Sequence, residues 1–278
     1  MTFNLSIDSY NIEKHATTAY DCLFSDEEYA ALVELCKTTF RRDFTNEVGV
    51  RLDYCNRTYI NGIALGVSEV RFFDFLTSNY ALFNFQRLID NANMNQKTAL
   101  QKLINIFSTD GEPDCVEAII KRRYLANTVA VSFLVSDMHG NYLITKRNSS
   151  VGIADGFVSV TVTGAVDGKD FLEEDPFIHC CQREMCEEMG YEIPISCIEP
   201  KMIVCGKSKL QPIVLADAKV NDLNDIVAGL DEHKGFLEEN RGHFICGTDD
   251  IRRILVNQSI RITEAARTHL ESVLNNCK

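Results

Sequence analysis

The sequence contains no tryptophan, no Cys-x-x-Cys pair and no apolar stretch long enough to cross a bilayer. A membrane-spanning helix needs about 20 mostly apolar residues, and a secretory signal needs a basic start followed by an apolar segment. Residues 1–8 provide neither. We therefore expect a cytoplasmic protein without a membrane partner, whose eleven cysteines are reduced and mostly buried as small apolar side chains.

Positive charge is also scarce in this chain. Its 278 residues include 28 Lys and Arg against 40 Asp and Glu, which gives a formal net charge of −12. The longest basic run is Lys121-Arg122-Arg123. Because nucleic acids attract proteins through clustered cations, we expect no general nucleic-acid binding. The length and the 45% hydrophobic content predict about two folded domains and exclude a disordered chain.

Signals of secondary structure fall into two groups. In the first, Ser25 and Glu28 form a capping-box pattern that predicts the start of a helix. Alternating apolar residues predict strands over residues 47–55 and 58–67, joined by a turn at Asn56 and Arg57. Helical spacing follows over residues 70–75 and 98–107.

Residues 108–114 are dense in turn formers, and we place a linker there. The chain is then divided into an N-terminal α+β domain, residues 1–126, and a second, mixed α/β domain, residues 127–278. The predicted elements of the second domain include strands over residues 128–135, 142–147 and 157–163, and a closing amphipathic helix over residues 263–275.

One helix of the second domain carries a cluster of acidic residues. Asp175-Pro176 predicts its start and Gly190 its end, so it covers residues 176–189. Its apolar face comprises Phe177, Ile178, Cys181, Met185 and Met189. Glu184, Glu187 and Glu188 gather on an adjacent face, where each like-charged pair destabilises a bare helix by about 0.2 to 0.5 kcal/mol. A hard divalent cation would compensate this repulsion, and the alternative is a solvated acidic face.

The residues around these glutamates favour the metal. From Arg183, the sequence R-E-M-C-E-E-M-G-Y resembles the core of the Nudix box, Arg-Glu-apolar-x-Glu-Glu-x-Gly-apolar. The box also begins with Gly, five residues and Glu, and here Gly164 and Asp170 have that spacing, with Asp in place of Glu. Residues 171–175 then form a five-residue insertion. The resemblance covers residues 127–191 and implies a Nudix-type α/β/α sandwich with a mixed sheet.

In the Nudix family, water attacks a diphosphate that links a nucleoside to another group, and helix carboxylates bind Mg²⁺ or Mn²⁺. The resemblance thus implies a hydrolase of a small nucleotide derivative. It assigns Glu184, Glu187 and Glu188 to the metal, together with the backbone of Gly164. Glu187 and Glu188 also count as catalytic, and so does Arg183, which would orient carboxylates or act only as a helix salt bridge. Asp170 is expected to have a structural role.

Residues outside the box helix complete the expected site. We assign the general base to Glu238, within a loop over residues 230–242, with Glu232 and Glu239 as alternatives. Arg147 and Phe157 are candidates for binding substrate, although Phe157 also fits a core position. A zinc site at His179, Cys180 and Cys181 is not expected, because neighbouring helix residues point in different directions.

Two other functional classes remain open. A Nudix-fold sensor would bind a nucleotide derivative without cleaving it, and a third protein class would use the fold only as a scaffold. Retention of all three glutamates favours catalysis, whereas Asp170 and the insertion favour the alternatives. In each case we expect residues 1–126 to cover the cleft or to build a homodimer interface.

Overall fold

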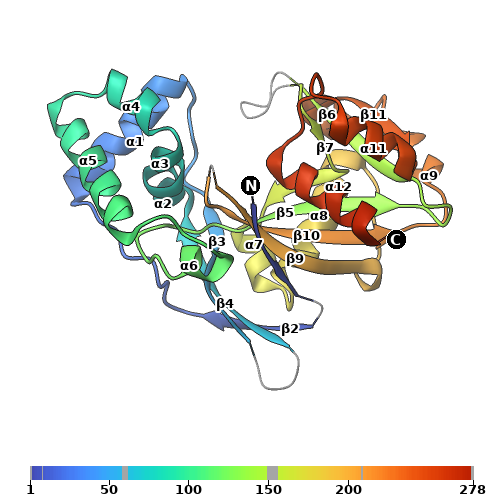
Figure 1. Ribbon diagram of the computed structural model, residues 1–278, viewed down its shortest axis with the longest axis horizontal. Coiled ribbons are helices and arrows are strands. Elements are labelled where there is room, and N and C mark those ends of the chain that lie inside the picture. Colours follow the sequence, from blue (N-terminus) through green and yellow to red (C-terminus); the bar gives the residue numbers. More distant parts are fainter. Residues whose placement is uncertain (1, 8, 58–61, 149–155, 208, 277–278) are drawn as a thin grey trace.

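The computed structural model describes residues 2–7, 9–57, 62–148, 156–207 and 209–276. Its described strands form two sheets. The helices of the N-terminal part gather on one side of the molecule, and the larger sheet with the C-terminal helices lies on the other (Figure 1). Among the described residues, no helix is both long and apolar enough to cross a membrane.

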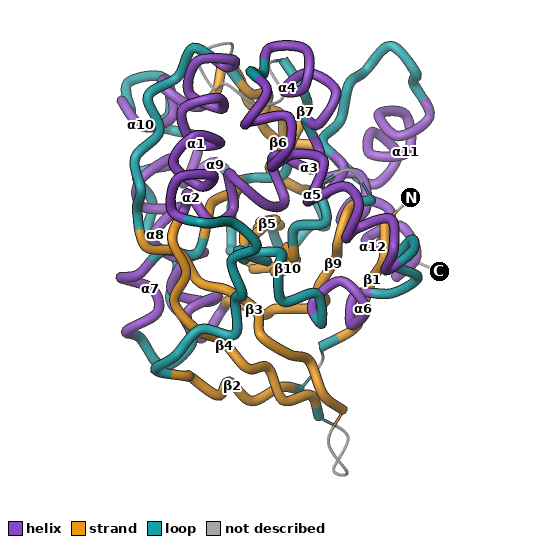
Figure 2. Tube along the Cα trace, turned by 90° about the vertical axis from the view of Figure 1, so that its left-hand side faces the viewer, coloured by secondary structure: helices purple, strands orange, loops and turns teal. Residues whose placement is uncertain are grey.

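The N-terminal part combines a small sheet with a group of helices. The sheet has the order β2-β4-β3, in which β2 is parallel and β3 antiparallel to β4, and Figure 2 shows β2 and β4 below the helices. The strands are β2 (Tyr10–His15), β3 (Val48–Arg57) and β4 (Ile63–Arg71). The helices are α1 (Asp26–Phe40), α2 (Phe72–Phe75), the π-helix η1 (Leu76–Tyr80), α3 (Ala81–Phe83), α4 (Phe85–Asn91), α5 (Met94–Asp110) and α6 (Val116–Ile120).

Local signals in this part are largely confirmed. The hydroxyl of Ser25 accepts from the amide of Glu28, whose carboxylate accepts from the amide of Ser25, so the predicted capping box begins α1. The predicted turn at Asn56 and Arg57 is wrong, because both residues belong to β3 and pair with β4. Residues 58–61, expected to open the next strand, lie outside the described residues.

The larger sheet has eight strands in the order β1-β9-β10-β5-β6-β11, with β7 paired to β6 and β8 paired to β5. Among its described strands only the β5–β10 pair is parallel, so the sheet is mixed as predicted. The strands are β1 (Thr2–Ser6), β5 (Ala130–Ser136), β6 (Tyr142–Arg147), β7 (Val158–Ser159), β8 (Val162–Ala165), β9 (Ile198–Gly206), β10 (Pro212–Lys219) and β11 (Asn240–Cys246). The strand β1, which no sequence pattern predicted, forms one edge by pairing with β9.

Helices cover both faces of the larger sheet. Phe133 of β5 belongs to one apolar cluster with Phe177 and Met185, and its neighbour Leu134 belongs to another with Leu270. Because successive strand residues point to opposite faces, this places the sheet between two helical layers. The predicted α/β/α sandwich is therefore confirmed. The helices are α7 (Gly168–Leu172), α8 (Pro176–Met189), η2 (Ile195–Cys197), α9 (Asn224–Val227), α10 (Lys234–Glu239), α11 (Thr248–Val256) and α12 (Glu264–Asn276).

The periodicity of apolar residues predicted the bounds of some elements in this part correctly and those of others incorrectly. The bounds of β6 and α8 are those predicted, and the closing helix is present as α12. The single strand expected over residues 157–163 is divided into β7 and β8. The expected loop over residues 230–242 is also wrong, because it contains α10 and the start of β11.

Candidate metal-binding and catalytic site

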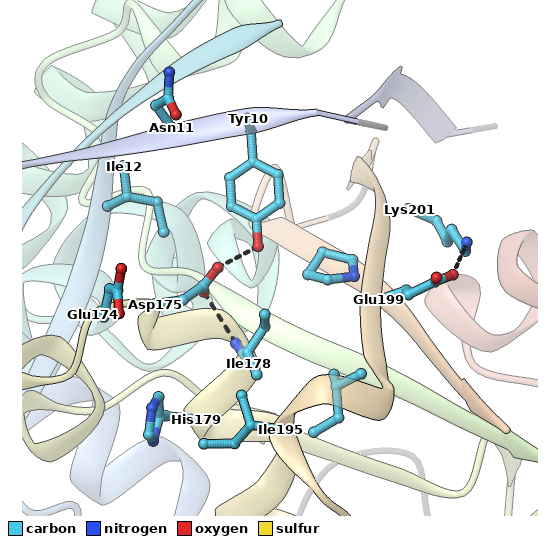
Figure 3. A pocket seen from close by; sticks show the side chains of 12 residues that line it. Tyr10, Asn11, Ile12, Glu174, Asp175, Ile178, His179, Ile195, Glu199 and Lys201 are labelled. Carbon is cyan, nitrogen blue, oxygen red and sulfur yellow. Dashed lines mark hydrogen bonds and ion pairs between the residues drawn. The ribbon is translucent and has the colours of Figure 1, made fainter. Parts of the chain in front are cut away.

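Helix α8, which carries the box residues, is fixed at both ends. One carboxylate oxygen of Asp175 accepts from the backbone amides of Phe177 (2.9 Å) and Ile178 (3.1 Å), and the other accepts from the hydroxyl of Tyr10 on β2 (Figure 3). Gly190 ends the helix in the left-handed conformation, with φ of 65°. A cavity of about 730 Å³ lies beside this N-terminal end and includes none of the three glutamates. The carboxylate cluster is thus a separate feature in the second half of α8.

The three glutamates differ in exposure. Glu184 and Glu188 are buried, at 9% and 7% exposed, whereas Glu187 is exposed. Glu184 packs against Gly164 of β8, where a Cβ atom would lie 2.0 Å from the glutamate carboxyl carbon. The amide nitrogen of Asn240 donates to Glu188 at 3.3 Å. Only two of the three box carboxylates therefore point inward, toward the sheet.

Arg183 connects these carboxylates to the preceding loop. Its guanidinium pairs with both carboxylate oxygens of Asp170, at 3.1 and 2.9 Å, and donates to the backbone oxygen of Ala165 at 3.0 Å. It also contacts Glu184 at 2.8 Å and Glu187 at 3.0 Å. Asp170 is 3% exposed and additionally accepts from a backbone amide at the start of α7. One arginine thus holds two box carboxylates and the segment from β8 to α7 together.

The pKa values of the two inward glutamates are both raised above that of a free glutamate. Burial raises the pKa of Glu184, and the ion pair with Arg183 only partly opposes it. Burial also raises the pKa of Glu188, and the carboxylates of Glu184 and Glu239 raise it further. A carboxylate pair with these properties favours either protonation or a bound cation.

The donor set fits a hard divalent cation. Among the residues that the structure describes, no group of three or more His, Cys, Asp or Glu side chains is arranged to enclose a metal on its own. Mg²⁺ does not require one, since it usually binds through one or two carboxylates, retained waters and substrate phosphates. Glu184 and Glu188 supply such oxygens, and the missing side chain at Gly164 leaves Glu184 the space that it occupies.

Helix α10 brings further charged groups to this region. A Cβ atom at Gly235 would lie 1.9 Å from the backbone oxygen of Glu187, so the glycine allows α10 to pack directly on the end of α8. Glu238 is 64% exposed and pairs with Lys234 at 3.4 Å. Glu239 pairs with Arg147 at 3.4 Å, and its charge influences Glu188. Of the two neighbours, Glu239 is thus the one oriented toward the inward carboxylates.

The predicted substrate-binding residues occupy the adjacent strands. Arg147, at the end of β6, donates to the hydroxyl of Thr163 at 3.0 Å and keeps 14% of its side chain exposed. Phe157 is half-buried, and the guanidinium of Arg261 lies 4.9 Å from its ring centre. Sequence reasoning missed Asn240, because nothing in a single sequence shows that β11 begins opposite α8.

Comparisons with known proteins give matches among solved structures that cover about half of the chain. No family model matches the sequence, and no curated protein matches it. Solved structures similar to it include a MutT protein from Methanosarcina mazei (15% identity, TM-score 0.37), covering 54% of this chain and 95% of that one. A Nudix hydrolase from Alicyclobacillus acidocaldarius (10%, 0.40) covers 53% and 91%, and one from Nitrosomonas europaea (15%, 0.35) covers 54% and 89%.

The motif lies on a helix that packs against the larger sheet. A mixed sheet lies between two helical layers, and the helix with the sequence R-E-M-C-E-E-M-G packs on one face of it. By the motif on α8, this chain resembles the Nudix hydrolases over residues 127–191.

Proposed function

We propose that this protein is a metal-dependent hydrolase that cleaves the diphosphate linkage of a small nucleotide derivative. The observation that carries the proposal is the pair of buried glutamates, Glu184 and Glu188, on successive turns of α8. Burying two like charges side by side is costly, so their presence is best explained by a cation that binds there in the working protein. Mg²⁺ or Mn²⁺ suits these oxygen donors.

Each residue then has a defined role. Glu184 and Glu188 hold the cation, Gly164 provides the space for Glu184, and Glu187 lies at the exposed edge of the same site. A divalent cation neutralises charge on the non-bridging phosphate oxygens and lowers the pKa of water. Arg183 keeps the carboxylates in position through its bonds to Asp170 and Glu184.

The base that activates the attacking water is expected at the end of α10. Glu238 is the residue assigned from the sequence, and its exposed side chain would have to turn from Lys234 toward Glu184 and Glu188. Glu239 is the competing assignment, because it already lies beside Arg147 and influences Glu188. Arg147 and Phe157 are proposed to contact the phosphates and the base of the substrate.

The experiment is a panel of nucleoside diphosphate derivatives incubated with Mg²⁺ or Mn²⁺ and scored for release of a nucleoside monophosphate or of phosphate. We expect turnover of at least one compound, its loss in EDTA and its loss in Glu188→Gln. The matched control is Glu34→Gln, which alters an exposed carboxylate on α1 that has no role in the proposal. Full turnover in EDTA would exclude the metal mechanism.

The sensor alternative makes a different prediction in the same panel. A sensor would bind a compound without cleaving it. Saturable binding without release of a nucleoside monophosphate or phosphate would therefore support the sensor and contradict the hydrolase proposal. Binding is measured by calorimetry with the same compounds in Mg²⁺. Loss of binding in Arg147→Gln, with unchanged unfolding temperature, would place the ligand over the carboxylate cluster in either case.

A further inference from the structure

Two arginines lie side by side at a glycine near the carboxylate site. A Cβ atom at Gly156 would lie 2.4 Å from the terminal nitrogen Nη2 of Arg241 and 3.2 Å from that of Arg261. Gly156 has a φ of 68°, a backbone conformation that favours glycine. The two guanidinium groups therefore approach the space that a side chain at this position would fill, and their positive charges lie close together.

The arginine pair is connected to the carboxylate site by short stretches of chain. The backbone amide of Gly156 donates to the backbone oxygen of Arg147 at 3.2 Å. Arg241 directly follows Asn240, whose side chain donates to Glu188 at 3.3 Å. The pair thus lies at the edge of the proposed site rather than within its carboxylate cluster.

Arg241 has no negative partner among the described residues. Its side chain is exposed and, within this part of the chain, makes no ion pair or hydrogen bond. A further cation lies near Arg147, namely the half-buried Lys209. Burial and the charge of Arg147 lower the pKa of Lys209, whereas Glu264 opposes this shift. Because like charges that are held together repel each other, a bound anion would stabilise this arrangement.

The chemistry and position of the pair favour a phosphate group on the nucleoside side of the substrate. Guanidinium groups bind phosphate oxygens through paired N–H donors, and two of them can offset a dianion. The guanidinium of Arg261 lies 4.9 Å from the ring centre of Phe157, which is proposed to contact the base. A phosphate bound between the arginines would therefore lie beside the nucleoside and not beyond the diphosphate.

We propose that Arg241 and Arg261 bind a phosphate monoester on the ribose of the substrate, in addition to the diphosphate that is cleaved. The inference rests on the proposed function for the position of the nucleoside. It narrows the substrate class to nucleotide derivatives that carry a 2′- or 3′-phosphate. Arg147 keeps its proposed contact with the phosphates of the diphosphate.

The test measures binding to the full chain with nucleotides that lack a cleavable diphosphate. The 5′-monophosphates of adenosine, guanosine, cytidine and uridine are compared with their 2′,5′- and 3′,5′-bisphosphates by calorimetry in Mg²⁺. Low ionic strength is used, because salt screens exposed charges. For at least one nucleoside we expect a bisphosphate to bind about tenfold more tightly or better, and the preferred isomer identifies the position of the phosphate.

Two results of this comparison would contradict the proposal. The first is that the second phosphate gives no gain in affinity for any nucleoside. The second is that methylene-bridged analogues of the nucleoside 5′-diphosphates, which carry their second phosphate on the 5′ side, gain as much as the bisphosphates do. In that case the arginines serve the phosphate chain and not the ribose.

Arginine variants separate phosphate binding from folding. Arg241→Gln removes a charge without an ion-pair partner among the described residues and relieves its repulsion with Arg261. Its unfolding temperature should be unchanged or higher, while the advantage of the bisphosphate is lost. Arg261→Gln should also lose this advantage. The matched control is Arg252→Gln, which alters an arginine that pairs with Asp249 at 2.6 Å on α11 and should keep the full advantage. An equal advantage in Arg241→Gln and the native protein would overturn the assignment.

These outcomes can be told apart from the outcome of the hydrolysis panel. If a compound of the panel is cleaved but no bisphosphate binds more tightly, only the ribose-phosphate site is wrong. If bisphosphate binding depends on Arg241 but no compound is cleaved, the phosphate site stands and the hydrolase proposal is wrong.

Discussion

The substitution Glu188→Gln tests the carboxylate site without knowledge of the substrate. Glu188 is 7% exposed, and burial followed by the charges of Glu184 and Glu239 raises its pKa to about 8. Each pKa unit corresponds to about 1.4 kcal/mol, so the ionised side chain costs the folded state at most about 4 kcal/mol at pH 8. Glutamine is uncharged and retains an oxygen that can accept from Asn240. In EDTA at pH 8 we expect the variant to be more stable by about 1 to 2 kcal/mol. This is less than the upper limit because neighbouring groups in the native protein can rearrange around the ionised side chain.

The pH dependence of this difference has a definite sign. A raised carboxyl pKa means that the folded protein keeps a proton that the unfolded chain releases. The native protein therefore loses stability relative to the variant as the pH rises from the ordinary glutamate value of 4.5 toward 8, and the difference disappears below about pH 4. Thermal unfolding in EDTA between pH 4 and pH 8.5 measures it, with an expected difference of about 2 to 8 °C at pH 8.

Magnesium and a matched variant complete this experiment. Adding Mg²⁺ should raise the unfolding temperature of the native protein and have little effect on Glu188→Gln, because a bound cation stabilises only the state that binds it. The control Glu187→Gln changes an exposed carboxylate on the same helix and should not become more stable in EDTA. If Glu188→Gln were less stable than the native protein at pH 8, or if the difference did not change with pH, the electrostatic reasoning would be refuted.

Three further predictions concern activity and geometry. Once a substrate is known, Glu238→Gln or Glu239→Gln should lower turnover by about 10²- to 10⁴-fold with little change in KM, and the variant that does so identifies the general base. Gly164→Ala should displace Glu184, whose carboxyl carbon would lie 2.0 Å from the new methyl group, and abolish the Mg²⁺-dependent rise in unfolding temperature. Arg183→Lys should destabilise the protein by about 1 to 3 kcal/mol in thermal unfolding, since lysine cannot form the bidentate pair.

Helix α8 was predictable from the sequence because its signals are local. The Asp175 cap, Pro176 and Gly190 act within a few residues of the helix ends, and the apolar period identifies the buried face. The sequence could not distinguish Glu187 from the other two box glutamates. The exposure of Glu187 depends on which neighbouring elements cover the helix, and those contacts are made by β8, α10 and β11.

Long-range pairing explains most of what sequence reasoning missed. The strand β1 has an ordinary five-residue pattern, but it pairs with β9, which lies about 200 residues later in the chain. Similarly, the strand expected over residues 157–163 is divided because β7 pairs with β6 and β8 with β5. A period of two residues predicts a strand, and it contains no information about the partner.

The N-terminal part also helps to position the carboxylate site through backbone pairing. Val50 of β3 donates to the backbone oxygen of Val166 at 3.0 Å and accepts from Val129 at 2.7 Å. Val166 immediately precedes the segment that starts α7 and carries Asp170, which forms the bidentate pair with Arg183. A continuous set of contacts therefore extends from β3 through this segment to the guanidinium that contacts the box carboxylates. Because two of these backbone bonds are made by Val50 of β3, the N-terminal part contributes directly to the support of this site.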